Sequence, residues 1–575
     1  MLTLRLALAA LALGSSSASL AAPATGPDPR FTGRDLFDLS AASDAQISPD
    51  GRMIAYVRRS NDIMTDKARS SIWLVDTASG SQRPLIASDG NSSSPRWSPD
   101  GKRLAYVMAN GSAPQLYIRW MDSGESARIT GLPDSPQGIA WSPSGRQIAY
   151  LMTVPDDGTK LGKAPDKPEG AEWAEPLQII DKVTYRADGA GYLKPGFDHI
   201  FVVDALGGAP RQLTFGAYHD GAPEWSRDGR SILFSAVRKP DWELVATNSE
   251  LYRLDLESGA IAELTTRNGP DFSPKMSPDG RSIAFLGFDD HLKGFEQANL
   301  YVMPSAGGAP RAVAPTLDRG LQQIEWSADG RSLVAAYEQD GSVTLSRIGL
   351  DGRVTPITHE VGGGGLDRPY AGGEFSLAHN SVIAFTTDSP GRPADVALSD
   401  GGGAIRRLTN LNQTTLSAKA LGGLTALDVR APDGGKVPTW VLLPVGYQQG
   451  KPVPAILEIH GGPYASYGPH FSTDYQLYNS GGYAVIYTNP RGSTGYGQAF
   501  ADGIEKTYPD SDYADLMAAV DAAVAAGIAD PNNLFVTGGS GGGILTAWII
   551  GKTDRFKAAA AQKPVINWTS MALTS

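Results

Sequence analysis

The chain of 575 residues contains no cysteine. This absence excludes disulfide bonds, thiolate metal ligands and a cysteine nucleophile, so the fold must depend on packing alone. Positive charge is also scarce, because 50 Lys and Arg residues face 61 Asp and Glu residues and the net charge is −11. Since no basic stripe is present to neutralise phosphates, we expect no nucleic-acid partner.

Long hydrophobic runs are missing beyond the N-terminus. Residues 1–22 place Arg5 before an apolar stretch and then small residues, which is typical of a secretory signal peptide cleaved near Ala21 or Ala22. The apolar stretch is shorter than the roughly 20 residues that span a bilayer. We therefore expect an exported protein, periplasmic or secreted, without a membrane span.

A turn motif recurs through the first two thirds of the chain. Each copy resembles Ser-Pro-Asp-Gly and precedes an apolar run, as is expected of a tight turn between two strands. Repeats of about 40 to 50 residues, each holding a few strands, are typical of a β-propeller, and seven repeats predict seven blades. The glycines of six copies are at 51, 101, 145, 229, 280 and 330, and a degenerate seventh copy has Asn380.

Two sets of residues in these repeats invite a functional interpretation. Tryptophans precede four of the turns and could form a ligand cage, but their fixed place in the repeat favours packing between blades. The repeated turn aspartates could bind calcium, yet each is explained by its own turn. We therefore expect no metal and no cofactor. The tryptophans are at 97, 141, 225 and 326, and the aspartates at 50, 100, 228, 279 and 329.

The third repeat is longer than the others. It contains an insertion, roughly residues 155–193, that is rich in proline, glycine and charge. Long excursions on repeat scaffolds often carry function, although a solvated loop is the simpler expectation.

From about residue 411 the pattern changes to strands that alternate with helices, which predicts a mostly parallel sheet with its site at the strand carboxyl ends. The sequence therefore predicts a multidomain protein, in which a seven-bladed β-propeller is followed by an incomplete α/β-hydrolase domain. The expected divisions are a signal peptide over 1–22, the propeller over 23–410 and the hydrolase domain over 411–575.

The sequence G-G-S-G-G at 538–542 follows an apolar strand pattern and precedes a helical one. This is the setting of a nucleophile elbow, a sharp turn that exposes a serine hydroxyl beside a general base. The simpler alternative is a glycine-rich loop with an incidental serine. The strand before and the helix after favour the elbow, with Ser540 as the nucleophile.

No histidine follows Ser540, although the chain contains seven histidines, and the only acidic residue after it is Asp554. In hydrolases with such an elbow the order along the chain is serine, then an acid, then histidine. We therefore expect this chain to stop before its triad is complete, and the fragment itself to be inactive.

Two further motifs precede the elbow: H-G-G-P at 460–463 and N-P-R-G-S-T-G-Y-G at 489–497. With the propeller in front, the order of these motifs resembles the prolyl oligopeptidase family of serine peptidases, in particular its acylaminoacyl peptidase and dipeptidyl peptidase branches. The resemblance implies that Ser540 accepts the acyl group. It also implies an oxyanion hole formed by the backbone N–H groups of Gly541 and Gly462.

Other residues of these motifs keep two interpretations each. Arg491 could orient a substrate carbonyl or pair internally. By the resemblance, Val565 and Trp568 line an apolar or proline-accepting specificity pocket, and the alternative is ordinary core packing. His460 could act as the base, although its place before the oxyanion loop implies a structural role.

A short acidic cluster, Asp510, Asp512 and Asp515, precedes or begins a predicted helix. We interpret it as helix capping and a complement to the helix dipole, not as acid catalysis.

The function expected from the sequence is a serine peptidase that acts on short peptides. The alternatives are a catalytically silent propeller module that binds peptide or protein partners, and an esterase with the same nucleophile. The resemblance carries one departure: the paired glutamates by which dipeptidyl peptidases hold a substrate amino terminus are not evident in the insertion of the third repeat, so removal of dipeptides is not implied.

Overall fold

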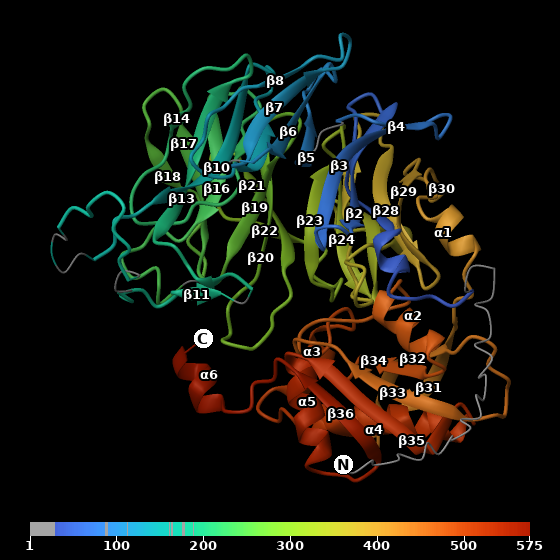
Figure 1. Ribbon diagram of the computed structural model, residues 1–575. Coiled ribbons are helices and arrows are strands. Elements are labelled where there is room, and N and C mark those ends of the chain that lie inside the picture. The colour runs from blue at the N-terminus through green and yellow to red at the C-terminus, as the bar shows by residue number, and fades with distance from the viewer. Residues whose placement is uncertain are drawn as a thin grey trace, which may run out of the picture.

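The computed structural model describes residues 29–574 except 87–89, 112, 160–161, 163–164, 175–178, 188 and 246. The predicted signal peptide over 1–22 lies outside the described residues. The chain forms a ring of sheets with a smaller α/β region directly below it (Figure 1). This lower part, residues 423–574, is called the C-terminal region below.

The described residues form seven four-stranded antiparallel sheets, which confirms the predicted seven-bladed propeller. Blade 1 contains β1 (Ser40–Ile47), β2 (Met53–Asp62), β3 (Lys67–Asp76) and β4 (Gln82–Pro84), and blade 2 contains β5 (Asn91–Trp97), β6 (Arg103–Ala109), β7 (Gln115–Trp120) and β8 (Ser126–Arg128). Blade 3 contains β9 (Gln137–Trp141), β10 (Gln147–Pro155), β13 (Gly196–Asp204) and β14 (Arg211–Gln212). Blade 4 contains β15 (Glu224–Trp225), β16 (Ser231–Ala236), β17 (Glu250–Asp255) and β18 (Ile261–Glu263), and blade 5 contains β19 (Asp271–Met276), β20 (Ser282–Gly287), β21 (Asn299–Pro304) and β22 (Arg311–Val313). Blade 6 contains β23 (Leu321–Trp326), β24 (Ser332–Gln339), β25 (Ser342–Gly349) and β26 (Val354–Val361), and blade 7 contains β27 (Phe375–Leu377), β28 (Ile383–Ser389), β29 (Arg392–Ser399) and β30 (Ile405–Arg407).

The repeated motif makes the turn between the first two strands of a blade. In blade 1, Ser48 Oγ donates to Asp50 Oδ1 at 2.6 Å, and the same carboxylate oxygen accepts the N–H of Arg52 at 3.1 Å. Gly51 takes a φ of +76°, which an L side chain rarely adopts. The turn aspartates are therefore used within their own turns, as the sequence suggested.

The repeated tryptophans tie each blade to the preceding one. In each case the indole N–H donates to a backbone carbonyl of the preceding inner strand, which supports the packing role over a ligand cage. The pairs are Trp97 to Gln46 at 2.9 Å, Trp141 to Arg96 at 2.9 Å, Trp225 to Ala140 at 3.1 Å and Trp326 to Lys275 at 3.0 Å.

Within the described part of the chain, the ring closes without a strand shared between its first and last blades. Asn412 lies beyond blade 7, and its side-chain amide both accepts from the N–H and donates to the carbonyl of Ser40, each at 2.7 Å. Ser376 makes a matching pair of bonds to Ile47 N–H and Ala45 O, both at 2.8 Å. Side-chain hydrogen bonds and apolar packing therefore join blade 7 to blade 1.

The C-terminal region is built on a six-stranded sheet with the order β31-β32-β34-β33-β35-β36. Its strands are β31 (Gly423–Arg430), β32 (Lys436–Leu443), β33 (Val453–Ile459), β34 (Ala484–Thr488), β35 (Ala529–Gly539) and β36 (Phe556–Gln562). Strands β34, β33, β35 and β36 are neighbours in the sheet and pair in parallel. Strand β32 pairs antiparallel with both of its neighbours, β31 and β34. The expected mostly parallel sheet therefore has two antiparallel pairings, of which β31–β32 is a hairpin closed by residues 431–435, whereas β32 and β34 are not consecutive in the chain.

Helices cover both faces of this sheet. On one face α4 (Ser511–Ala525) packs Leu516 and Val520 against Val441, and on the other α2 (Thr473–Ser480) packs Tyr475 against Leu442. Neighbouring residues of one strand serve opposite faces, as strand geometry requires. The remaining helices are η1 (Asp35–Phe37), α1 (Gln413–Ser417), α3 (Gln498–Ala501), η2 (Asp502–Ile504), α5 (Gly541–Ile550) and α6 (Trp568–Thr574).

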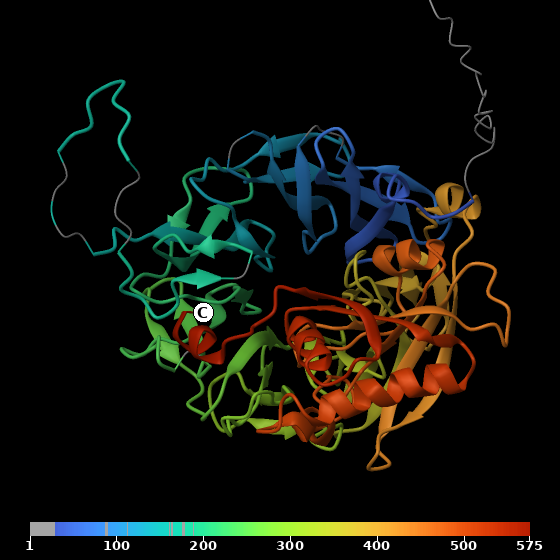
Figure 2. The same cartoon turned by 60° about the horizontal axis from the view of Figure 1, so that its bottom comes forward.

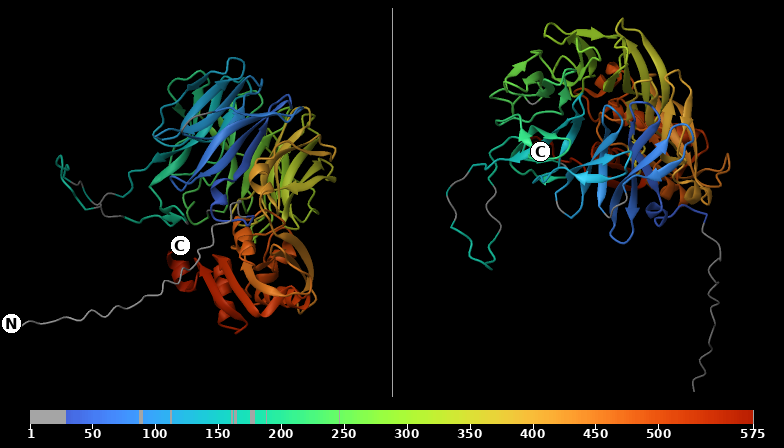
Figure 3. Two further views of the ribbon diagram at one scale, coloured as in Figure 1. Left: turned by 45° about the vertical axis from the view of Figure 1, so that its right-hand side comes forward. Right: turned by 90° about the horizontal axis from the view of Figure 1, so that it is seen from above.

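Two segments stand away from these two bodies. The insertion of blade 3, which includes β11 (Arg186–Ala187) and β12 (Gly191–Tyr192), projects from the rim of the propeller (Figure 3). Helix α6 lies apart from the sheet, on the side of the propeller that faces the C-terminal region (Figure 2). Across the described residues, none of the helices combines the length and the apolar character needed to cross a bilayer.

The division predicted at residues 410 and 411 stays a prediction. The last propeller strand ends at Arg407 and the first strand of the C-terminal region begins at Gly423, with α1 between them.

Candidate active site

Ser540 stands at a sharp turn between β35 and α5. Its φ of 56° and ψ of −117° lie outside the regions that L residues usually occupy, and the residue is exposed. The strand, turn and helix are those of a nucleophile elbow, in which backbone strain presents the hydroxyl to the substrate.

The glycines around Ser540 are required by close backbone packing. A Cβ atom at Gly541 would lie 2.5 Å from the carbonyl oxygen of Gly462, and one at Gly542 would lie 2.2 Å from that of Ile459. Real Cβ contacts are not this short, so the first turn of α5 fits against the end of β33 only without side chains. The elbow and the H-G-G-P loop, residues 460–463, are thereby held together.

The H-G-G-P loop supplies one of the two predicted oxyanion donors. The N–H of Gly461 donates to the Tyr370 hydroxyl at 2.8 Å. In the described part of the chain, the N–H groups of Gly462 and Gly541 donate no hydrogen bond. Both predicted donors are therefore free, and their residues are in contact.

His460 is not placed as a general base. Its Nδ1 lies 2.8 Å from the carbonyl of Gly461 and its Nε2 lies 2.9 Å from Ser493 Oγ. Burial lowers the pKa of its imidazole to about 4, so the ring is neutral near pH 7. The ring orders two loops, as the resemblance implied.

Arg491 is engaged inside the C-terminal region. Its Nε and Nη2 donate to the two oxygens of Asp515 at 3.0 and 2.8 Å, and Nη1 pairs with Asp433. Of the two interpretations left open by the sequence, this arrangement favours the internal pair. The alternative, in which Arg491 orients a substrate carbonyl, stays a prediction that no contact of the described residues supports.

The three residues of the acidic cluster do not share one role. Asp510 is the N-cap residue of α4, but its side chain makes no capping bond. Asp512 Oδ1 accepts the N–H groups of Asp510 and Tyr513, and burial raises the pKa of this carboxyl to about 6. Asp515 binds Arg491. The predicted capping role therefore belongs to Asp512 and not to Asp510.

The predicted pocket residues lie after β36. Trp568 is 53% exposed and meets the Tyr508 ring edge-on, with 6.2 Å between centroids. The Tyr508 hydroxyl donates to the carbonyl of Gly541 at 3.2 Å, which brings Trp568 to the elbow. Val565 is half-buried. Their part in substrate binding stays a prediction.

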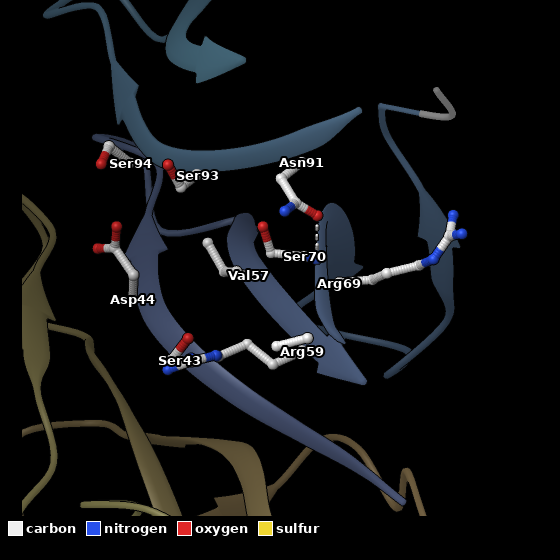
Figure 4. Close-up of a pocket in the computed structure, with 10 residues that line it drawn as sticks. Ser43, Asp44, Val57, Arg59, Arg69, Ser70, Asn91, Ser93 and Ser94 are labelled. Atoms are coloured by element: carbon white, nitrogen blue, oxygen red, sulfur yellow. Dashed lines mark hydrogen bonds between the residues drawn. The ribbon is translucent and has the colours of Figure 1, made fainter. Parts of the chain in front are cut away.

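Among the cavities of the propeller, two are lined mainly by strand residues. One of about 800 Å³ occupies the centre of the ring, where residues of all seven inner strands line it and Lys275 pairs with Glu325 at 2.6 Å. The other, of about 280 Å³, is lined by polar side chains of blades 1 and 2, including Asp44 and Arg59 (Figure 4). Ser540 lines neither cavity.

Comparison with known proteins agrees with this geometry. The sequence profile described as "Prolyl oligopeptidase family" matches residues 469–575, which include the elbow. The profiles described as "TolB beta propeller domain" and "Dipeptidyl peptidase IV (DPP IV) N-terminal region" match residues 40–157 and 171–290. The uncharacterized peptidase YuxL of Bacillus subtilis is 31% identical over 560 residues, and the alignment covers 94% of this chain and 83% of that protein.

The chain belongs to the prolyl oligopeptidase family.

Other family members resemble it over a similar length. The dipeptidyl-peptidase 5 of Porphyromonas gingivalis is 26% identical, with 97% of this chain and 82% of that protein covered. Among solved structures, the acylaminoacyl peptidase of Pyrococcus horikoshii has a TM-score of 0.77 at 20% identity, with 94% and 80% covered. An acylaminoacyl peptidase in complex with Z-Gly-Gly-Phe-chloromethyl ketone has a TM-score of 0.79 at 20% identity, with 95% and 81% covered. These two structures share the fold.

Sequence reasoning missed the residues of the propeller that reach the family motifs. Tyr370 touches Gly461, and Arg368 pairs with Glu458 at 2.8 Å, two residues before His460. The available signal was a charged and aromatic stretch, D-R-P-Y, flanked by glycine runs where a plain blade connection was expected.

Proposed function

We propose that this protein is a serine peptidase that hydrolyses short peptides through an acyl-enzyme on Ser540. The observation that carries the proposal is the strained, exposed Ser540 with the free N–H groups of Gly541 and Gly462 beside it. Peptidases of the same family with dipeptidyl-peptidase and acylaminoacyl-peptidase names support peptides as the substrate class.

In the proposed reaction Ser540 Oγ attacks the scissile carbonyl carbon and loses its proton to a general base. The carbonyl oxygen becomes an alkoxide that the N–H groups of Gly541 and Gly462 stabilise. The C–N bond then breaks, the leaving amine takes the proton from the base, and water hydrolyses the Ser540 ester.

The described residues place no general base beside Ser540. Among the described residues, none of the seven histidines hydrogen-bonds to Ser540, and His460 binds Ser493 instead. Loss of the base in a serine triad costs about six orders of magnitude in turnover. We therefore propose that the 575-residue chain by itself has little peptidase activity, and that the propeller limits access to short peptides.

The test is covalent labelling of Ser540 by a fluorophosphonate, with and without added imidazole as a replacement base. We expect slow labelling that imidazole accelerates and that Ser540→Ala abolishes. Ser540→Ala removes one exposed hydroxyl, and thermal unfolding serves as its control for an intact fold. No labelling even with imidazole would overturn the nucleophile, whereas fast stoichiometric labelling without it would overturn only the low activity of this chain.

We also propose that the protein is exported, periplasmic or secreted, because Arg5 precedes a short apolar stretch and small residues near Ala21. N-terminal sequencing of the mature protein checks this proposal: a start at or near Ala22 or Pro23 supports it, and a start at Met1 contradicts it.

A further inference from the structure

The connection between blades 6 and 7, residues 362–374, is more than a linker. It is called the inter-blade loop here. Its two ends lie close together, since a Cβ atom at Gly372 would be only 2.7 Å from the Cα of Gly364. Glycines thus allow the backbone to close at the base of the loop, and residues 365–371 project from it as a unit.

This projecting part binds the C-terminal region through six consecutive residues. Residues 366 to 371 each make a polar contact with that region, through backbone as well as side chains. The contacts are Leu366 O with Thr473 N–H at 2.7 Å, Asp367 O with Ser472 Oγ at 2.6 Å, Arg368 with Glu458 at 2.8 Å, Pro369 O with Gly468 N–H at 2.9 Å, Tyr370 Oη with Gly461 N–H at 2.8 Å and Ala371 N–H with Ser466 O at 3.0 Å.

Among these contacts, the one made by Tyr370 is to the H-G-G-P loop itself. A Cβ atom at Gly461 would lie 3.1 Å from Tyr370 Oη and 3.5 Å from Ser540 Cβ, so Gly461 is close to both side chains. The Tyr370 ring is itself fixed against Tyr467, with ring centroids 4.7 Å apart. The hydroxyl that holds Gly461 is therefore on a rigid support.

This hydrogen bond decides which amide of the loop faces the substrate. Because the N–H of Gly461 is used by Tyr370, the adjacent N–H of Gly462 is the donor left for an alkoxide formed at Ser540. Gly462 has a φ of +125°, a conformation that only glycine adopts readily, so without support the two-glycine segment has many other conformations to choose from. Preorganised donors stabilise an alkoxide far better than donors that must first be ordered.

We propose that Tyr370, a propeller residue, is a positioning residue for the oxyanion hole, holding the Gly461 amide so that the Gly462 N–H is directed to the reaction at Ser540. The proposal rests on the serine peptidase function given above. Docking of the propeller is then a condition for an ordered oxyanion hole, and not only a barrier to large substrates.

The first test measures amide hydrogen exchange in the full 575-residue chain and needs no activity. Tyr370→Phe removes only the hydroxyl that accepts the Gly461 N–H. We expect exchange in a peptide covering residues 459–464 to become at least about tenfold faster, since an amide without its partner exchanges from local openings. Tyr487→Phe is the matched control, because the Tyr487 hydroxyl belongs to the same aromatic cluster but donates to Gly468 O at 3.3 Å.

The second test measures the imidazole-assisted labelling of Ser540 as a function of fluorophosphonate concentration. A positioning role predicts that Tyr370→Phe lowers the maximal labelling rate about tenfold, less than the hundredfold or more for loss of a donor, and leaves the half-saturating concentration unchanged. Tyr487→Phe should keep both quantities.

Unchanged exchange at 459–464 in Tyr370→Phe would overturn the proposal. Faster exchange with an unchanged maximal labelling rate would also overturn it, because the bond would then order the loop without serving the reaction. If the wild-type protein is not labelled at all, the proposed function fails, and the exchange result alone decides whether Tyr370 holds the loop.

Discussion

The propeller and the C-terminal region are stabilised in different ways. The propeller uses local contacts that recur from blade to blade, whereas the C-terminal region is packed around a single sheet. In the propeller one arrangement recurs: in five blades a serine and an aspartate fix the turn, and in four blades an indole binds the preceding blade. In the C-terminal region burial depends on position in one sheet. The five residues of β34 are all buried, whereas residues 557–561 of β36 are exposed.

This difference shows where single substitutions should matter. Contacts of the propeller are local and repeated, so the loss of one leaves the others intact. Contacts between the two regions include buried charged groups, such as Arg368 with Glu458, and the loss of one partner there leaves a buried charge unpaired. The three predictions below test this contrast.

The largest effect is expected at Arg368, which links the inter-blade loop to Glu458. Glu458 is fully buried, and burial raises the pKa of its carboxyl to about 7 even with Arg368 present. We expect Arg368→Ala to lower the free energy of unfolding by about 3–5 kcal/mol above neutral pH, because the carboxylate would be left unpaired. Urea denaturation measures this change.

The pH dependence sharpens the same experiment. A carboxyl whose pKa is raised in the folded state binds its proton more tightly there, so stability falls as pH rises from its usual pKa through about 7. The loss in Arg368→Ala should therefore shrink as pH falls through about 7, and Arg368→Ala/Glu458→Gln should recover most of it. Arg96→Ala, which breaks a partly exposed pair within the propeller, should cost no more than about 1 kcal/mol. Equal losses of stability for Arg368→Ala and Arg96→Ala would contradict the expected difference between the buried pair that joins the two regions and the partly exposed pair within the propeller.

An intermediate effect is expected at His470, which lies in the C-terminal region against blades 6 and 7. Its Nδ1 lies 2.7 Å from Asp388 and its Nε2 2.8 Å from Gly341 O. Burial alone would lower the pKa of this imidazole, but Asp388 and the hydrogen bonds raise it. The charged ring thus stabilises the contact below its usual pKa, and this stabilisation is lost as pH rises through the raised value.

We expect His470→Gln to cost about 1–2 kcal/mol near pH 6 and less at alkaline pH, as measured by denaturation across that range. Asp388→Asn should abolish the same pH dependence from the other side of the pair. A loss in His470→Gln that does not change with pH would argue against a charged ring.

The smallest effect is expected inside the propeller. Trp326→Phe removes an indole N–H that donates to Lys275 O and should cost about 0.5–1.5 kcal/mol. Trp141→Phe makes the same change in blade 3. Since these blades are separate, the double variant should lose the sum within about 0.5 kcal/mol, as thermal or urea unfolding can show. Strong coupling would mean that the ring responds as one unit.

Much of this architecture can be predicted from the sequence because its signals are local. Pro-Asp-Gly turns at a regular period predicted the seven blades, and glycines around Ser540 predicted the elbow, since both depend on residues adjacent in the chain. The antiparallel pairing of β32 with β34 was not predicted, because strand composition does not fix direction.

The supports of the site could not be predicted for a similar reason. Tyr370 and Gly461 are 91 residues apart, and no periodicity links a blade connection to a loop of another domain. For Arg491 the sequence left two interpretations open, and only the fold showed that it pairs with Asp515 and Asp433.

The closure of the ring has a consequence for its topology. Every blade is a continuous stretch of chain, and Ser40 and Asn412 meet where the ring begins and ends. A circular permutation that joined these two points and opened the chain between two other blades would break no strand pairing within a blade. The starting blade is thus interchangeable in principle, and whole blades could be gained or lost as uninterrupted gene segments.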